Sequence, residues 1–166
     1  TKAPSDEELA KRRAWVGIDK LSVQDNNLVK TIPELYVDLS SIAKGYGVDV
    51  VAEYLESAGI NNYMVDIGGE VRTKGTNGKE APWRIAIEKP AADGVSQTVQ
   101  EVIEPGDSSI ATSGDYRNYF EQDGVRFSHT IDPKSGRPIT HNLVSITVIA
   151  DNCMSADGLS TGLNVL

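Results

Sequence analysis

Short strand patterns separated by turn residues fill most of the chain between two helical patterns, and this order is its strongest constraint. Residues 63–67 and 143–150 are apolar or β-branched runs, and residues 83–88 alternate between apolar and polar side chains. Apolar residues recur every fourth position in the helical pattern at 42–54, and a second such pattern covers 155–166. We therefore predict an α+β fold, in which two helices cover a mainly antiparallel sheet.

The composition excludes several classes of protein. The chain has 166 residues, about one domain's worth. Its 16 Lys and Arg against 24 Asp and Glu give a net charge of −8, which disfavours nucleic-acid binding because such proteins usually present a basic face. The single cysteine, Cys153, rules out an internal disulfide and a four-cysteine zinc site. No run approaches the ~20 apolar residues of a membrane span, so we expect no transmembrane segment.

Asp157 and Thr161 are the strongest candidates for metal ligands. They are four residues apart in the last helical pattern, for which Ser155 is the expected N-cap. Side chains at this spacing share one face of a helix. A carboxylate and a hydroxyl offer hard oxygens, which suit Mg²⁺ or Ca²⁺ better than zinc. The alternative is a structural pair, with an acid near the helix N-terminus and a packed threonine.

The two histidines differ in what surrounds them in the sequence. His129 lies at the end of a strand pattern that runs into the turn at 132–136. Histidine is the usual general base near neutral pH, so His129 is the candidate for proton transfer. A strand-end histidine can equally be structural. His141 follows Pro138 in a loop and shows no partner, so we assign it no chemistry.

Polar residues also gather where a short strand, expected at 36–39, meets the helix that starts near Ser40 or Ser41. Exposed amides at a helix N-terminus attract anions, and Lys44 would add a positive charge one turn into the helix. This spacing indicates an anion site near Asp38 and Lys44. The alternative is that Asp38 or Ser40 simply caps the helix.

Two glycine pairs indicate close approaches of the backbone. Gly45 and Gly47 each cost about 1 kcal/mol inside a helix relative to alanine, so a packed backbone or a ligand must lie close to that turn. Gly68 and Gly69 follow the strand at 63–67 and would let the backbone approach a ligand, although most such pairs are turns. The sequence has no Gly-x-Gly-x-x-Gly or Walker motif, which excludes the usual dinucleotide and P-loop sites.

Taken together, the polar segments resemble the FAD:protein FMN transferase (ApbE-like) family. Each segment is short, but their occurrence in the family's order is specific. The segments are VDLSSIAKGY at 37–46, VDIGGE at 65–70, ATSGDYR at 111–117, HTIDP at 129–133 with GRP at 136–138, and ADGLST at 156–161.

The resemblance implies a fold and a domain assignment. It implies an ApbE-like, T-fold-related architecture in which residues 1–166 form a single domain, the C-terminal portion of a flavin transferase domain. Family members are markedly longer. Because the chain begins without methionine and ends within a helical pattern, we expect the fold to be incomplete at both ends.

The resemblance also implies an enzyme that splits FAD at its pyrophosphate. FMN would pass to a threonine hydroxyl of an acceptor protein, AMP would leave, and Mg²⁺ would be required. The acceptor would be a subunit of a redox-driven membrane complex, although no residue identifies it. The family is usually periplasmic and tethered to the inner membrane by an N-terminal lipid, so we expect the same location here.

Roles for single residues follow from the same resemblance. His129 would be the base that activates the acceptor hydroxyl. The implied Mg²⁺ ligands are Asp157, Thr161, Ser160, and Ser41 or its neighbouring backbone. The implied FAD-binding residues are Asp38, Lys44, Ile131, Gly68 and Gly69.

Three other functions stay open on the sequence alone. A Mg²⁺-dependent FAD pyrophosphatase would give FMN and AMP, with water in place of threonine. A flavin-binding module would bind FAD without turnover, although mere storage needs no base such as His129. The last alternative is an α+β domain whose polar residues are all structural.

Overall fold

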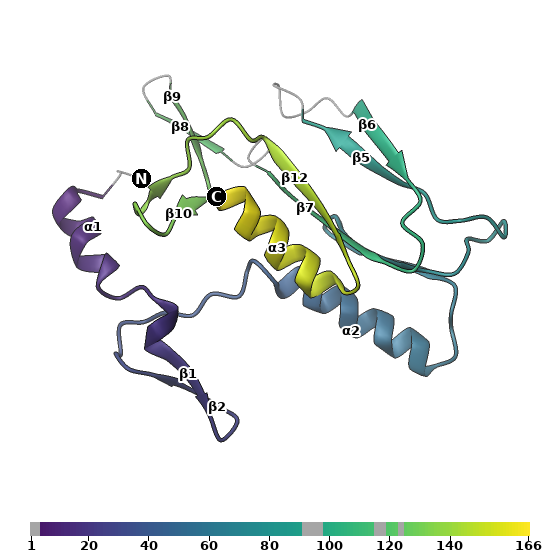
Figure 1. Cartoon of the computed structure of the whole chain (residues 1–166), viewed down its shortest axis with the longest axis horizontal. Helices are drawn as coiled ribbons and strands as arrows, with labels where there is room; N and C mark the ends of the chain where they lie inside the picture. The colour runs from purple at the N-terminus through teal and green to yellow at the C-terminus, as the bar shows by residue number, and fades with distance from the viewer. Residues whose placement is uncertain (1–3, 91–97, 115–118, 123–124) are drawn as a thin grey trace.

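The computed structural model describes residues 4–90, 98–114, 119–122 and 125–166 (Figure 1). The helices are α1 (Asp6–Arg13), α2 (Ala43–Ser57) and α3 (Cys153–Val165), with a 3₁₀ helix at Ile18–Lys20. The strands are β1 (Leu21–Gln24), β2 (Asn27–Lys30), β3 (Tyr63–Ile67), β4 (Glu70–Lys74), β5 (Ile85–Lys89), β6 (Thr98–Ile103), β7 (Ser109–Gly114), β8 (Tyr119–Gln122), β9 (Val125–Ser128), β10 (Ile131–Asp132), β11 (Arg137–Pro138) and β12 (Ser145–Ala150). Residues 115–117 of the third family-like segment lie outside the described residues.

A four-stranded sheet forms the centre of the molecule. Its order is β12–β7–β4–β3, and every neighbouring pair is antiparallel. Helices α2 and α3 contact each other and pack on this sheet (Figure 1). The core joins α2, β3 and α3 through Val48, Ala52, Tyr63, Val65 and Cys153. The predicted α+β class, an antiparallel sheet covered by helices, is confirmed.

The described residues also form four two-stranded units outside this sheet. They are the antiparallel pairs β1–β2, β5–β6, β8–β9 and β10–β11. The β1–β2 hairpin projects away from the central sheet (Figure 1). Its turn places Asp25 and Asn26 at φ 48° and 60°, the left-handed region that type I′ turns require.

Helix α2 buries a different face from the one that its apolar spacing marks. Tyr46, Val50 and Tyr54 recur at the predicted interval, yet they are 59%, 45% and 72% exposed. The buried residues of α2 are Gly45, Val48, Asp49 and Ala52. Most of these are small, because α3 lies so close that larger side chains do not fit between the two helices.

Gly45 is the point of closest approach between α2 and α3. A Cβ at this position would lie 2.3 Å from the carbonyl oxygen of Cys153 and 2.8 Å from Cβ of Asp157. The glycine cost expected from the sequence is therefore explained by a packed backbone rather than a ligand.

Three local predictions are wrong. Residues 36–39 form no strand; instead the Asp38 carboxylate accepts a hydrogen bond from the Ser40 amide at 2.7 Å, and this local turn competes with extended pairing. Helix α2 begins at Ala43 rather than near Ser40 or Ser41. Helix α3 begins at Cys153, and its N-cap is Asn152, whose side chain accepts from the Ser155 amide at 2.8 Å.

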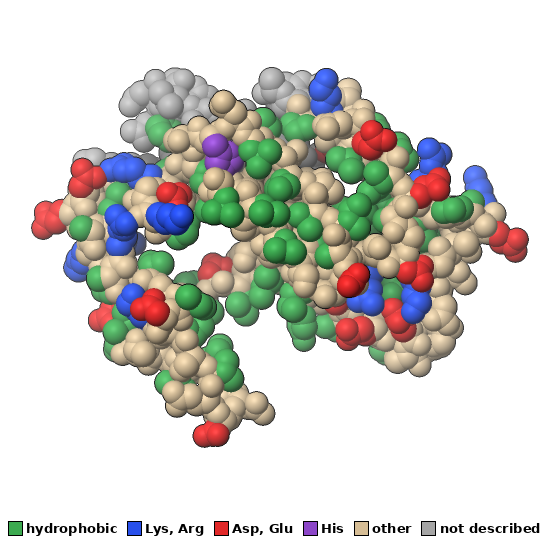
Figure 2. Space-filling model, in the orientation of Figure 1, with side chains coloured by type: hydrophobic (Ala, Val, Ile, Leu, Met, Phe, Trp, Pro, Cys, Tyr) green, Lys and Arg blue, Asp and Glu red, His purple; other side chains and the backbone are tan. Residues whose placement is uncertain are grey.

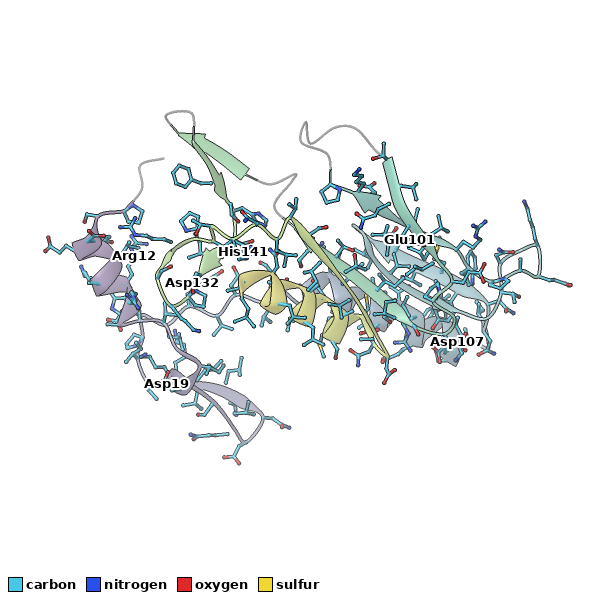
Figure 3. All side chains as sticks on the ribbon, turned by 45° about the horizontal axis from the view of Figure 1, so that its top comes forward. Arg12, Asp19, Glu101, Asp107, Asp132 and His141 are labelled. Atoms are coloured by element: carbon cyan, nitrogen blue, oxygen red, sulfur yellow. The ribbon has the colours of Figure 1, made fainter. Side chains whose placement is uncertain are left out.

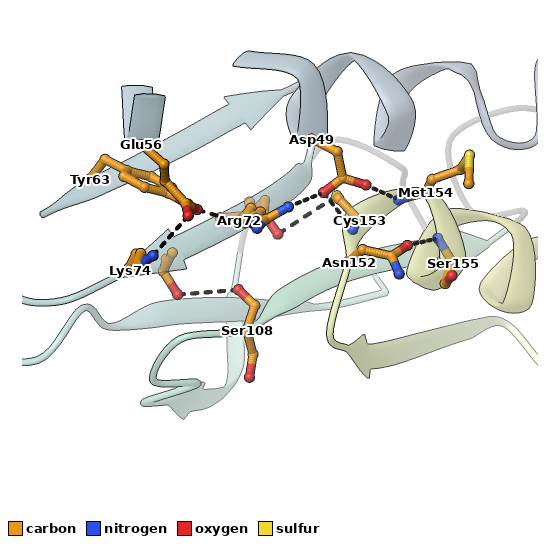
Figure 4. A network of polar contacts seen from close by, with 12 residues as sticks. Asp49, Glu56, Tyr63, Arg72, Lys74, Ser108, Asn152, Cys153, Met154 and Ser155 are labelled. Atoms are coloured by element: carbon orange, nitrogen blue, oxygen red, sulfur yellow. Dashed lines mark hydrogen bonds and ion pairs between the residues drawn. The ribbon is translucent and has the colours of Figure 1, made fainter. Parts of the chain in front are cut away.

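A buried carboxylate ties α2 to the start of α3 (Figure 4). Asp49 accepts hydrogen bonds from the amides of Cys153 at 2.9 Å and Met154 at 2.8 Å. It also pairs with Arg72 of β4 at 2.8 Å. A carboxylate at a helix N-terminus satisfies free amides and complements the helix dipole. Asp49 therefore joins three elements at one point.

The part of the chain that the structure describes has no helix long and apolar enough to cross a bilayer.

Candidate functional site

A cavity of about 290 Å³ lies where the start of α2, the start of β4, the end of β7 and one face of α3 meet. The sheet brings these segments together, because β4 and β7 are neighbours and α3 packs on both. Four residues with predicted roles line this cavity, namely Lys44, His129, Asp157 and Thr161. The other lining residues are Ser40, Glu70, Thr112, Ser113, Gly114, Thr130 and Asn164.

Helix α3 presents Asp157 and Thr161 on one face, as their spacing predicts. The Asp157 side chain is buried, at 4% exposure, and its Oδ2 accepts a hydrogen bond from the Gly45 amide at 2.9 Å. The close helix packing at Gly45 therefore also fixes the carboxylate.

Hydroxyl groups of β7 and of the α3 turn that follows Asp157 contact one another. Ser113 Oγ of β7 lies 2.8 Å from Ser160 Oγ and 3.2 Å from Thr161 Oγ1. Ser160 also donates to the main-chain carbonyl of Asp157 at 2.9 Å. Ser113 and Thr161 line the cavity, whereas the predicted ligand Ser160 is fully buried and is not among its lining residues.

A buried ion pair forms another wall of the cavity. Glu70, at 3% exposure, lies 2.6 Å from the Nζ of Lys44, whose side chain is half-exposed. Burial raises the pKa of the Glu70 carboxyl, the ammonium of Lys44 lowers it, and the nearby charge of Asp157 raises it again. Two carboxylates and one lysine therefore lie within electrostatic reach of each other.

A second cavity of about 420 Å³ adjoins the first. The two share Lys44, Thr112 and Gly114 as lining residues. Gly68 and Gly69 line the second cavity at φ 63° and 99°, conformations that non-glycine residues rarely adopt. The predicted glycine contacts therefore lie beside the cavity that contains Asp157 and His129.

The remaining predicted residues lie around a third, mainly apolar hollow. Asp38, Ser41 and Ile131 line it together with residues of α3, among them Leu159 and Leu163. The structure does not bring Ser41 to the cavity that Asp157 and Thr161 line; its neighbour Ser40 is there instead. Residues 38–41 therefore contribute to both the cavity lined by Asp157 and the apolar hollow.

His141 has a structural position (Figure 3). Its Nε2 lies 2.7 Å from the main-chain carbonyl of Asn164, which can only accept, and its Nδ1 accepts from the Leu143 amide at 3.2 Å. Both ring nitrogens are therefore engaged in the neutral form. His129, in contrast, is exposed and lines the cavity.

The donor types at the cavity favour a hard cation. Among the described residues, no group of three or more His, Cys, Asp and Glu side chains could hold a metal ion. A divalent ion bound here would therefore use hydroxyl or main-chain oxygens besides Asp157.

Comparison with known families decides which family this arrangement belongs to. The model of the ApbE family matches residues 1–166. The chain belongs to the ApbE family. The resemblance drawn from the five sequence segments is therefore confirmed.

Among relatives in this family, a FAD:protein FMN transferase of Vibrio cholerae is 66% identical over 163 residues, which cover 98% of this chain and 48% of that protein. The solved structure of the flavin transferase ApbE from Vibrio cholerae is similar with a TM-score of 0.87 at 62% identity, over 99% of this chain and 51% of that chain. The flavinyl transferase ApbE of Pseudomonas stutzeri gives a TM-score of 0.86 at 45% identity, over 99% and 50%. This chain thus spans about half the length of the curated relatives it matches.

Two lining residues of this cavity, Glu70 and Asn164, were not singled out from the sequence. Glu70 directly follows the Gly68–Gly69 pair and could have been found from that segment. Asn164 carries no signal in the sequence, because only the helical face that it shares with Asp157 and Thr161 brings it to the cavity.

Proposed function

We propose that the protein containing this chain transfers FMN from FAD to a threonine hydroxyl of an acceptor protein. The proposed reaction requires Mg²⁺ and releases AMP. The names of its relatives support a transfer of FMN from FAD to protein. The observation that carries the proposal is that Lys44, His129, Asp157 and Thr161, from three separate segments, line one cavity.

The donor set fits Mg²⁺. The Asp157 carboxylate and the Thr161 hydroxyl are hard oxygens on one face of α3 that line the cavity, and they would hold the ion. Ser160 is also a predicted ligand, but it is fully buried outside the lining and its hydroxyl donates to the main-chain carbonyl of Asp157. Ser41 itself lines the apolar hollow, so of residues 38–41 the neighbouring Ser40, which lines this cavity, would contribute instead. Among the described groups at this cavity, Asn164 Oδ1 and Glu70 Oε2 are buried without a hydrogen-bond partner, and Glu70 Oε2 makes an ion pair with Lys44. Bound Mg²⁺ would offset the charge of the diphosphate and polarise its phosphoryl oxygens.

The chain's own residues would perform the remaining tasks. Lys44 brings a positive charge to a site that also holds Glu70 and Asp157, and a diphosphate needs such a charge. His129 would accept the proton of the threonine hydroxyl, a poor nucleophile at neutral pH. A positioned base contributes ~10²–10⁴-fold to such a step.

The test uses the full-length protein with FAD, Mg²⁺ and a candidate acceptor protein. We expect a flavin-labelled acceptor on a denaturing gel and an equal amount of AMP. His129→Ala should bind FAD but lose labelling, whereas His141→Ala is the matched control that leaves labelling in place. Normal labelling by His129→Ala would remove the proposed base.

FAD hydrolysis is the second candidate, because His129 is exposed and water can reach it. In that case FMN and AMP would form from FAD alone at the same rate with and without acceptor. Dependence of AMP release on the acceptor would favour the transferase.

The proposed location and partner rest on the family resemblance. We propose a periplasmic protein tethered to the inner membrane by an N-terminal lipid, with an acceptor in a redox-driven membrane complex. Fractionation of cells that produce the full-length protein tests the location.

A further inference from the structure

We propose that Glu70 is a positioning residue whose buried carboxylate holds the Lys44 ammonium at the junction of two cavities, where it meets the diphosphate of FAD. The proposal rests on the proposed function, and it assigns a task to a carboxylate that the transfer chemistry does not otherwise use.

One ion pair directs the long side chain of Lys44, which is 49% exposed. Its Nζ lies 2.6 Å from Oε2 of Glu70. Its Cδ passes beside the Gly68 turn, where a Cβ at Gly68 would be 3.5 Å away. A lysine side chain is flexible when free and loses much entropy when ordered. The ion pair therefore favours one position of the ammonium before a ligand arrives.

Lys44 is shared by the two adjoining cavities. It lines both the cavity of about 290 Å³ and the cavity of about 420 Å³, and among the described residues lining either it is the only lysine or arginine. FAD has two arms joined by a central diphosphate. A cation shared by two adjoining cavities is suited to the central group of such a ligand.

The burial of the Glu70 carboxylate is unfavourable by itself. Glu70 is 3% exposed and lies near Asp157, so its charge costs free energy and opposes an anionic ligand. Without Glu70, the Lys44 ammonium would be free to turn toward Asp157 or solvent. Holding Lys44 in place is the task that the geometry assigns to this carboxylate.

The experiment measures the affinity of the full-length protein for FAD and for riboflavin, which has no phosphate. Glu70→Gln should weaken FAD binding on the order of tenfold, the loss of one charge-assisted contact, and leave riboflavin binding unchanged. Lys44→Met should have the same effect, and the double variant should be no weaker than Lys44→Met alone. Glu70→Asp, which keeps the charge, should recover part of the affinity.

Glu56→Gln is the matched control, because Glu56 also pairs with a lysine, Lys74, at 2.8 Å but lines neither cavity. It should leave both affinities unchanged.

Two results would show that Glu70 has only a structural role and would overturn the proposal. In one, Glu70→Gln weakens the binding of FAD and of riboflavin equally. In the other, its effect on FAD binding adds to that of Lys44→Met. An unchanged FAD affinity in Glu70→Gln would also overturn the proposal. If Glu70→Gln does not fold, Glu70→Asp and Lys44→Met decide by the same comparison. Failure of the wild-type protein to bind FAD would overturn the proposed function itself.

Discussion

The α2–α3 region and the amino-terminal segment at 4–39 are built in different ways. Where α2 meets α3, small residues let the helices touch, and buried polar groups such as Asp49 and Asp157 bridge them. In residues 4–39, Leu35 is the one buried residue, and charged side chains of both signs crowd α1 (Figure 2). Tight packing thus coincides with the candidate site, where the proposed binding of a metal ion and a phosphate would need fixed side chains.

The largest effect is expected at Gly45. Gly45→Ala places a Cβ 2.3 Å from the Cys153 carbonyl oxygen, so the helices must separate, and we expect a loss of about 3 kcal/mol in the free energy of unfolding. Urea denaturation of the wild type and the variant measures this change in the free energy of unfolding. The control Gly162→Ala, in α3 with nothing within 4 Å of the added Cβ, should be neutral or stabilise by up to about 1 kcal/mol. Equal effects at both sites would contradict the packing account.

The next largest effect is expected at Asp49. Asp49→Asn removes the charge that pairs with Arg72 and accepts from the first two amides of α3, and we expect a loss of about 2 kcal/mol in the free energy of unfolding. The control is Glu8→Gln, which breaks the exposed pair with Arg12 at 2.7 Å and should leave the melting temperature unchanged. A loss of stability in Glu8→Gln as large as that in Asp49→Asn would show that polar contacts contribute equally in the two regions and would contradict the comparison.

A pH effect should follow from Glu56. Hydrogen bonds from Lys74 and Tyr63 lower the pKa of the Glu56 carboxyl below its usual value of 4.5. Its contribution to stability is therefore fully present above the unfolded-state pKa and is lost as the pH falls through the lower folded-state pKa. Thermal melts across pH 3–6 should fall less steeply in Glu56→Gln than in the wild-type protein. Identical slopes would contradict the pairing.

The smallest effect is expected at Ser5. Its Oγ accepts from the Glu8 amide at 3.3 Å and caps α1. Ser5→Ala should lower the local opening free energy of α1 by about 1 kcal/mol without changing the global melting temperature, because α1 buries no residue. Hydrogen exchange of the α1 amides measures the first quantity. A fall in global stability would show that α1 is coupled to the core.

The fold class and the polar face of α3 were within reach of the sequence because both follow from local periodicity. The buried face of α2 could not be predicted in this way. Tyr46, Val50 and Tyr54 have helical spacing but are exposed, because α3 packs against the face of α2 that carries Gly45, where only a small residue fits. The placement of Ser40 rather than Ser41 at the cavity depends on the turn closed by Asp38. The buried face of α2 and the position of Ser40 both depend on contacts between segments that are distant in the sequence, and residue spacing does not reveal such contacts.

We propose that the face of α3 bearing Asp157 forms a cation-dependent site for FAD. The most direct test of this proposal is the FAD affinity of the full-length protein with Mg²⁺ and with a chelator, in the wild type, Asp157→Asn and the exposed control Asp151→Asn. We expect the chelator to weaken binding in the wild type and in Asp151→Asn, and Asp157→Asn to bind weakly with or without Mg²⁺. Strong, Mg²⁺-dependent FAD binding by Asp157→Asn would contradict the account.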